Sequence, residues 1–318
     1  MKGPKVSVVM SVYNGAEHLR EAVESILNQT FTDFEFIIVD DGSADSTWDI
    51  LKSYEDPRIV LARNRENIGL TKSLNEGLGM MKGDYIARQD ADDVSLPERL
   101  GEQVAVLDDE QGVGLVCSSF VEMNHEGQEV GTVILPAKDH EIMDYLLRWN
   151  CLCHGAVMFR RECVARIGVY RDEFQFAQDY DLWLRIAERY KVANLSRPLY
   201  KRRISPGIIS IIHRQAQDEY ARLAIELAEE RARRGRDRLG ASISQSHPNA
   251  WQRRRSSARI TFFWARELSR QRRRREALTM LARSILNNPF RRDPWALSSG
   301  VVRRKFRQIA RYGLRMFR

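Results

Sequence analysis

Long apolar runs are missing from this sequence. No stretch reaches the about 18 consecutive apolar residues that suggest a membrane-spanning helix, so we expect none. The first eleven residues are interrupted by Ser7 and Ser11 and carry no cleavage site, so we expect no secretory signal. No GxGxxG pattern follows the first apolar segment, and dinucleotide binding is therefore not supported. These absences together predict a cytoplasmic protein.

Cysteine is also scarce, with four residues in 318. That number does not make a disulfide framework. The stretch from Cys151 to His154 reads Cys-Leu-Cys-His and looks like half of a zinc site, but no second ligand pair follows at a useful spacing. We therefore expect buried or partly buried free thiols.

Charge is distributed unevenly along the chain. The net charge is +8, yet residues 240–318 hold 20 Lys and Arg against 3 Asp and Glu, whereas residues 1–239 hold 31 against 40. The length suits one large domain with an appendage. We expect a catalytic domain at 1–235, with a nucleotide-binding half at 1–118 and an acceptor half at 119–235, followed by a basic helical region at 236–318.

The basic region has alternating arginine runs and apolar clusters. Trp251 precedes three arginines, and Arg272 to Arg275 form a second run, with Phe262, Phe263 and Trp264 between them. Basic amphipathic helices with aromatics suit an anionic bilayer, which would place the protein on the cytoplasmic face of a membrane. The alternatives are a helical appendage packed on the catalytic body and, less favoured, nucleic-acid binding.

The first 118 residues alternate short apolar segments with helical periodicity. Apolar runs at 5–13, 35–39, 58–61, 84–88 and 113–118 predict strands, and helices are predicted at 16–28, 46–54, 71–81 and 97–109. This rhythm predicts an α/β fold, a mostly parallel sheet flanked by helices. Ligands in such sheets bind beyond the carboxyl ends of the strands, where Asn14, Asp40, Asp41, Asp90 and Asp92 all stand.

The pattern changes after residue 119. It predicts a hairpin at 120–133, a helix at 139–149, a strand at 155–159, a helix at 179–190, an edge strand at 199–204 and a long helix at 214–234.

Three acidic segments could carry chemistry, and each also has a plain structural reading. Asp90, Asp92 and Asp93 suit Mg²⁺ or Mn²⁺, or form a solvated turn before the next helix. Asp41, before Gly42, could accept a hydrogen bond from a nucleotide base, or cap a helix. Asp179 could be a general base, or an N-cap. Taken singly, these alternatives stay open.

Taken together, five ordered segments resemble the family 2 glycosyltransferases, which have the GT-A fold. The resemblance is close over residues 5–105 and continues to about 215. The segments are VVMSVYN (8–14), LREAVESILNQTFTDFEFIIVDDGSADST (19–47), ENIGLTKSLNEGL (66–78), GDYIARQDADD (83–93) and FAQDYDLWLRIAE (176–188).

The resemblance assigns roles to individual residues. It implies that Asp179 is the catalytic base and that Asp92, with Asp90, holds Mn²⁺ or Mg²⁺. Asp41 would read the N–H of a uracil-type base, and Trp183 would shape the acceptor pocket or the core. The other implied donor residues are Ser11, Val12, Tyr13, Asn14, Lys72, Arg88 and Asp90, and the other implied acceptor-side or supporting residues are His154 and Gln178.

The same resemblance implies an inverting transfer of sugar from a nucleotide-diphosphate sugar, with UDP favoured, to the hydroxyl of a glycan or lipid-linked acceptor. Polysaccharide or glycolipid synthesis at the cell surface would follow. A nucleotidyltransferase of related fold is the alternative, but no glycine- and lysine-rich loop follows residues 5–13. Nucleic-acid binding would account for the basic region at 236–318, but it would account for none of the motifs in residues 1–215.

The sequence departs from the family pattern at three positions. Ser11 stands where the family often has Pro, and Gln178 replaces a more usual Glu before the base. Ser205 stands where the family usually has His. If that His serves metal or diphosphate, His213 or Arg203 could replace it.

Overall fold

The computed structural model describes residues 3–137, 139–204, 214–234 and 236–239, which belong to one unit of the chain, Met1–Ser242. Residues 240–318, Ser205 and His213 lie outside the described residues, so the predicted boundary near 235, the basic helices and the replacement of Ser205 stay predictions. Within the described part of the chain, no helix has both the length and the apolar character needed to cross a membrane.

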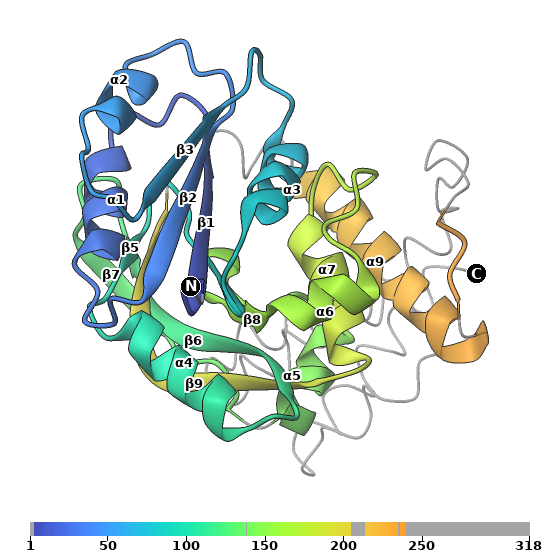
Figure 1. Cartoon of the computed structure of the whole chain (residues 1–318). Coiled ribbons are helices and arrows are strands. Elements are labelled where there is room, and N and C mark those ends of the chain that lie inside the picture. The colour runs from blue at the N-terminus through green and yellow to red at the C-terminus, as the bar shows by residue number, and fades with distance from the viewer. Residues whose placement is uncertain (1–2, 138, 205–213, 235, 240–318) are drawn as a thin grey trace, which may run out of the picture. The chain divides into compact units, whose positions relative to one another are not determined.

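One mixed sheet of nine strands organises the described residues (Figure 1). Its order is β3-β2-β1-β4-β8-β6-β9-β5, and β7 pairs with β6 beside this path. The first four strands in this order are parallel, β8 runs antiparallel to β4 and β6, and β9 runs parallel to β6. The strands are β1 (Val6–Val12), β2 (Phe34–Asp40), β3 (Ile59–Arg63), β4 (Tyr85–Arg88), β5 (Val94–Ser95), β6 (Val113–Met123), β7 (Glu129–Val133), β8 (Met158–Arg160) and β9 (Lys191–Arg203).

Helices cover both faces of the sheet, which confirms the predicted fold class. Figure 1 shows α1, α2 and α4 on one side and α3, α6, α7 and α9 on the other. The bounds are α1 (Leu19–Leu27), α2 (Thr47–Lys52), α3 (Leu70–Met80), α4 (Arg99–Asp109), α5 (Asp139–Leu146), α6 (Arg161–Ile167), α7 (Gln178–Ala187) and α9 (Arg214–Arg234), with a short 3₁₀ helix at His154–Ala156.

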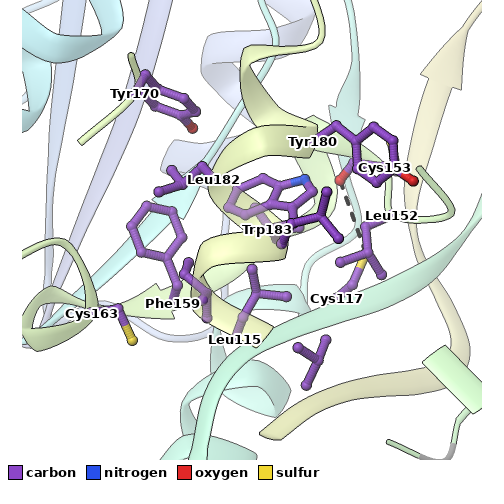
Figure 2. Packing of buried hydrophobic residues seen from close by; sticks show 14 of the residues in the cluster. Leu115, Cys117, Leu152, Cys153, Phe159, Cys163, Tyr170, Tyr180, Leu182 and Trp183 are labelled. Atoms are coloured by element: carbon purple, nitrogen blue, oxygen red, sulfur yellow. Dashed lines mark hydrogen bonds between the residues drawn. The ribbon is translucent and has the colours of Figure 1, made fainter. Parts of the chain in front are cut away.

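Alternation along β1 sends side chains into two core layers. Val8 and Met10 pack under α1 and α4, whereas Val9 points to the opposite layer with α3 and α7. In the second layer Trp183 is fully buried, with its ring 5.8 Å from that of Phe159 (Figure 2). Burial of each large apolar side chain contributes about 1.5–3 kcal/mol. Both faces of β1 are buried, which explains its unbroken apolar sequence.

Three predictions of secondary structure were incomplete or wrong. The segment predicted as an edge strand at 199–204 is the end of a thirteen-residue strand, β9, which lies between β6 and β5. Its middle carries Arg197 and Pro198, which hide the strand pattern. Residues 154–156 form a 3₁₀ turn rather than strand. The short elements β5 and α6 were not predicted, because two to seven residues show too little periodicity.

Candidate active site

The loops that follow β1 and β2 are fastened to each other. The amide of Ala44 donates to Asn14 Oδ1 at 2.9 Å, and the amide of Asn14 donates to Ser43 Oγ at 2.9 Å. Asn14 has φ 49°, a left-handed conformation that asparagine tolerates. Of the predicted donor segment, the side chains of Tyr13 and Asn14 are exposed at this edge, while those of Ser11 and Val12 are buried.

Asp41 is held at the start of α3. Its carboxylate is 2% exposed and accepts hydrogen bonds from Asn64 Nδ2 at 2.9 Å and from the amides of Ile68 and Gly69 at 3.0 and 2.9 Å. The capping alternative therefore applies, though to α3 rather than α2. A carboxylate can accept about four hydrogen bonds, which leaves room for one more from a base. Lys72, in the first turn of α3, is exposed.

Arg88 at the end of β4 orients Asp90. Its buried guanidinium donates from Nη2 to Asp90 Oδ1 at 2.6 Å and from Nε to His154 Nε2 at 3.1 Å. Gly155 faces the same carboxylate, since a Cβ there would lie 2.9 Å from Asp90 Oδ2 and 1.9 Å from Tyr200 Oη. Only glycine fits this close approach.

Asp92 and Asp93 crowd the same turn with negative charge. Although the Asp92 side chain is exposed, the surrounding chain displaces part of the water near its carboxyl, and this desolvation, followed by the charge of Asp90, raises its pKa. Burial, then the charges of Asp90 and Asp92, raises the pKa of the Asp93 carboxyl well above its ordinary value. Asp93 is anchored to β9, because the amide of Arg203 donates to its Oδ1 at 2.7 Å. Asp92 is exposed and Asp90 is half-buried.

This donor set fits a hard divalent cation. It offers carboxylate oxygens, the ligands that Mg²⁺ and Mn²⁺ prefer. Positive charge here would offset both the desolvation and the negative charge of Asp90, which together raise the pKa of Asp92. Asp92 and the second oxygen of Asp90 are the atoms that could hold the ion, since the first oxygen of Asp90 is paired with Arg88.

Asp179 is the second residue of α7. It is half-buried, and Asn150 Nδ2 donates to its Oδ2 at 2.7 Å. Burial, followed by the charge of Arg88, lowers the pKa of His154, while the charges of Asp90 and Asp179 oppose that shift. The turn at residues 90–93 and the start of α7 therefore both lie near this histidine.

Matches with known proteins decide the family. The family described as "Glycosyl transferase family 2" matches residues 7–168. Bacillus subtilis EpsE is 39% identical over 205 residues, covering 63% of this chain and 73% of EpsE. The chain belongs to glycosyl transferase family 2. It is a nucleotide-sugar glycosyltransferase, and the alternatives of a nucleotidyltransferase or a nucleic-acid-binding protein are set aside.

Further similarities agree with this membership. Amylovoran biosynthesis glycosyltransferase AmsE of Erwinia amylovora is 31% identical to this glycosyltransferase over 214 residues, covering 64% of this chain and 78% of AmsE. The structure of S. aureus TarS 1–349 in complex with UDP-GlcNAc aligns with a TM-score of 0.59 and 18% identity, covering 89% of this chain and 81% of that TarS 1–349 chain. Mannosyltransferase PcManGT of Pyrobaculum calidifontis, in complex with GDP-Man and Mn²⁺, aligns with a TM-score of 0.56 and 17% identity. The alignment covers 98% of this chain and 81% of the PcManGT chain. At these identities the two structures support the GT-A fold alone.

Two of the predicted acceptor-side residues of the glycosyltransferase are buried. Trp183 is 0% exposed and packs among buried apolar side chains (Figure 2). Its ring lies 6.0 Å from that of His154, so it supports this histidine from the core. Gln178 is 5% exposed. His154 is half-buried, and its Nε2 lies 3.0 Å from the hydroxyl of Tyr170. The four cysteines are buried free thiols, as predicted.

Several residues that contact the candidate site of this glycosyltransferase were not predicted from the sequence. Arg99 of α4 is buried and donates from Nη1 to the carbonyls of Arg88 and Gly155. Tyr170 and Asn150 contact His154 and Asp179 from irregular segments. No spacing in the sequence marks these residues. Arg203 was considered as a replacement for the missing histidine, but its guanidinium contacts Glu21 and the carbonyls of Asp92, Asn124 and His125.

Proposed function

We propose that this glycosyltransferase inverts the anomeric centre of its donor sugar and that Asp179 is the general base. One observation carries the proposal. Arg88 bonds both Asp90 and His154, and the charge of Asp179 also acts on His154. A donor held at Asp90 and Asp92 would therefore lie next to the carboxylate at the start of α7. Direct attack by an acceptor on the face opposite the leaving group requires such a neighbouring base.

Asp179 would take the proton of the acceptor hydroxyl as its oxygen attacks the anomeric carbon. Asn150 fixes one carboxylate oxygen at 2.7 Å, which orients the other toward the acceptor. The C–O bond to the leaving diphosphate breaks as the new glycosidic bond forms, and the proton ends on Asp179.

The proposed donor is a UDP-sugar, bound together with Mn²⁺ or Mg²⁺. A bound ion on Asp92 and Asp90 would supply Lewis-acid stabilisation of charge on the leaving diphosphate. Arg88 orients Asp90, while Tyr13, Asn14 and Asp41 border the region for the nucleotide. The structures of TarS with UDP-GlcNAc and of PcManGT with GDP-Man and Mn²⁺ support a nucleotide-sugar donor in this fold.

The acceptor is proposed to be a glycan or lipid-linked glycan of a cell-surface polysaccharide. AmsE, named for amylovoran biosynthesis, is one of the relatives that supports this assignment. The basic region 240–318 would bring the enzyme to an anionic membrane surface that carries the acceptor.

Substitution Asp179→Asn tests the base directly. It removes proton acceptance while keeping the size and the contact with Asn150, so we expect turnover to fall by about 10²–10⁴-fold. Donor affinity should stay near the wild-type value. The measurement is release of nucleoside diphosphate from a panel of UDP-, GDP- and dTDP-sugars with Mn²⁺, together with donor binding.

A matched control is Asp172→Asn, an exposed aspartate in the segment before α7 that accepts from Asn75. This control should keep wild-type turnover. If Asp179→Asn turns over as fast as the control, another residue removes the proton and the assignment of the base is wrong.

A further inference from the structure

Two histidines from distant parts of the chain meet beside α1. His18 immediately precedes α1, and His125 lies in the turn between β6 and β7. Their rings pack edge to face with centroids 4.9 Å apart, and Nε2 of His18 lies 3.3 Å from Nδ1 of His125. Neither histidine takes part in the proposed transfer.

The separation of these two nitrogens matches a pair of ligands on one tetrahedral ion. Zinc–nitrogen bonds are about 2.0–2.1 Å long, so two nitrogens at the tetrahedral angle stand roughly 3.3–3.4 Å apart. The observed 3.3 Å agrees with this separation. Both side chains are accessible from solvent, since His18 and His125 are each half-buried, so an ion could enter.

Glu17 completes the group. Its Oε1 lies 2.9 Å from His125 Nε2, and one ligand atom from each of the three residues lies within 4.8 Å of those of the other two. When Nε2 of His125 donates its proton to Glu17, Nδ1 presents its lone pair toward His18. A carboxylate on the second ring nitrogen is the usual partner of a metal-bound histidine.

Charged groups of both signs surround the histidine pair. Arg203 Nη1 donates to the carbonyl oxygen of His125. The charge of Arg203 is itself offset by Glu21, whose Oε2 lies 2.6 Å from Arg203 Nη2.

We propose that Glu17, His18 and His125 form a binding site for a transition-metal ion of the Zn²⁺ class. Imidazole nitrogen favours Zn²⁺, Ni²⁺ and Cu²⁺, whereas the oxygen-only pair Asp90 and Asp92 favours Mg²⁺ or Mn²⁺. The two sites therefore differ in ligand chemistry. A bound ion would fasten the β6–β7 turn to the start of α1, two segments that Arg203 already joins through the carbonyl of His125 and through Glu21.

The test is calorimetric titration of Zn²⁺ alone into the full chain, with no nucleotide present. Thermal unfolding with added Zn²⁺ and the visible absorption of added Co²⁺ give two further readouts. We expect one ion per chain at this site, a higher unfolding midpoint and a nitrogen-ligated Co²⁺ spectrum. His18→Gln and His125→Gln should each weaken binding by more than about 100-fold, and Glu17→Gln by about 10–100-fold.

Asp92→Asn is the control that separates the two metal sites, and it should bind Zn²⁺ like the wild type. His140→Gln, which removes a different histidine, should do the same. The proposal is overturned if the wild type binds no Zn²⁺, or if both His18→Gln and His125→Gln keep wild-type affinity. None of these readouts depends on transferase activity, so the result stands apart from the proposed reaction.

Discussion

Three carboxylates lie within four residues, at Asp90, Asp92 and Asp93. The protein neutralises their negative charges to different extents. Arg88 pairs with Asp90, and the amide of Arg203 donates to Asp93. Among the described residues no cation forms an ion pair with the exposed Asp92, and desolvation, followed by the charge of Asp90, raises its pKa. Asp92 is thus the residue best placed to hold an ion. Its charged form is also unfavourable in the metal-free protein.

Asp92→Asn should therefore stabilise the metal-free protein. Between the ordinary carboxyl pKa of about 3.9 and the raised value, the folded chain holds a proton that the unfolded chain has lost. Stability consequently falls as pH rises through that window, and Asn at this position removes the loss. Thermal unfolding from about pH 4 to about pH 8 should show a higher midpoint for Asp92→Asn at neutral pH, with no gain from Mn²⁺.

Asp33→Asn, at an exposed position before β2, is the matched control and should follow the wild type. A lower midpoint for Asp92→Asn than for this control, at neutral pH without metal, would contradict the account of charge repulsion.

Single residues also show how far sequence reasoning reaches. Asp90, Asp92 and Asp179 stand in segments whose order marks them as candidates. Arg99 and Tyr170 do not, because a buried arginine on a helix and a buried tyrosine in a loop look like surface and core residues in the sequence. Their contacts with the backbone around Arg88 and with His154 exist only after the chain has folded.

At the scale of elements, β9 joins the two halves of the domain. It pairs in parallel with β6 along most of its length, and its last residue, Arg203, reaches the carbonyl of Asp92 and the side chain of Glu21 in α1. The side chain of Arg203 is 1% exposed and donates to three carbonyls and to Glu21. The position of Asp92 therefore depends on a strand that lies more than a hundred residues later in the sequence.

Arg203→Met should lower the free energy of unfolding by at least about 2 kcal/mol, because it leaves several carbonyls without donors. Denaturant unfolding measures this loss. The neighbouring Arg202 provides the control, since its side chain is 44% exposed and pairs with Glu122 on the surface. Arg202→Ala should cost no more than about 1 kcal/mol. Equal losses for the two variants would show that the contacts of Arg203 do not support the fold.

Strand order explains what the sequence could and could not predict about these elements. Parallel strands β1, β2 and β4 have their carboxyl ends at one edge, so Asn14, Asp41 and Asp90 were expected together. The contact of Arg88 with His154 instead requires β8 to pair antiparallel with β4. No local periodicity encodes that pairing, and the short strand β8 was only partly predicted.

At the scale of the whole chain, charge separates a mildly acidic body from a strongly basic region. Residues 240–318 are predicted to bind anionic membrane surfaces, each basic residue near the surface contributing about 1 kcal/mol. Flotation of the full chain with anionic vesicles should show binding at low salt and release at high salt. Neutral vesicles should bind less. Replacement of Arg272 to Arg275 by glutamine should weaken the binding, and absence of binding to anionic vesicles at low salt would contradict the prediction.

We propose that nucleotide binding depends on a metal ion held by Asp92. The decisive measurement is calorimetric titration of UDP, GDP and dTDP into the wild type and Asp92→Asn, with and without Mn²⁺. We expect UDP to bind the wild type more tightly with Mn²⁺ than without it, and Asp92→Asn to lose this dependence. Equal UDP affinity with and without Mn²⁺, or unchanged dependence in Asp92→Asn, would show that Asp92 holds no ion needed for nucleotide binding.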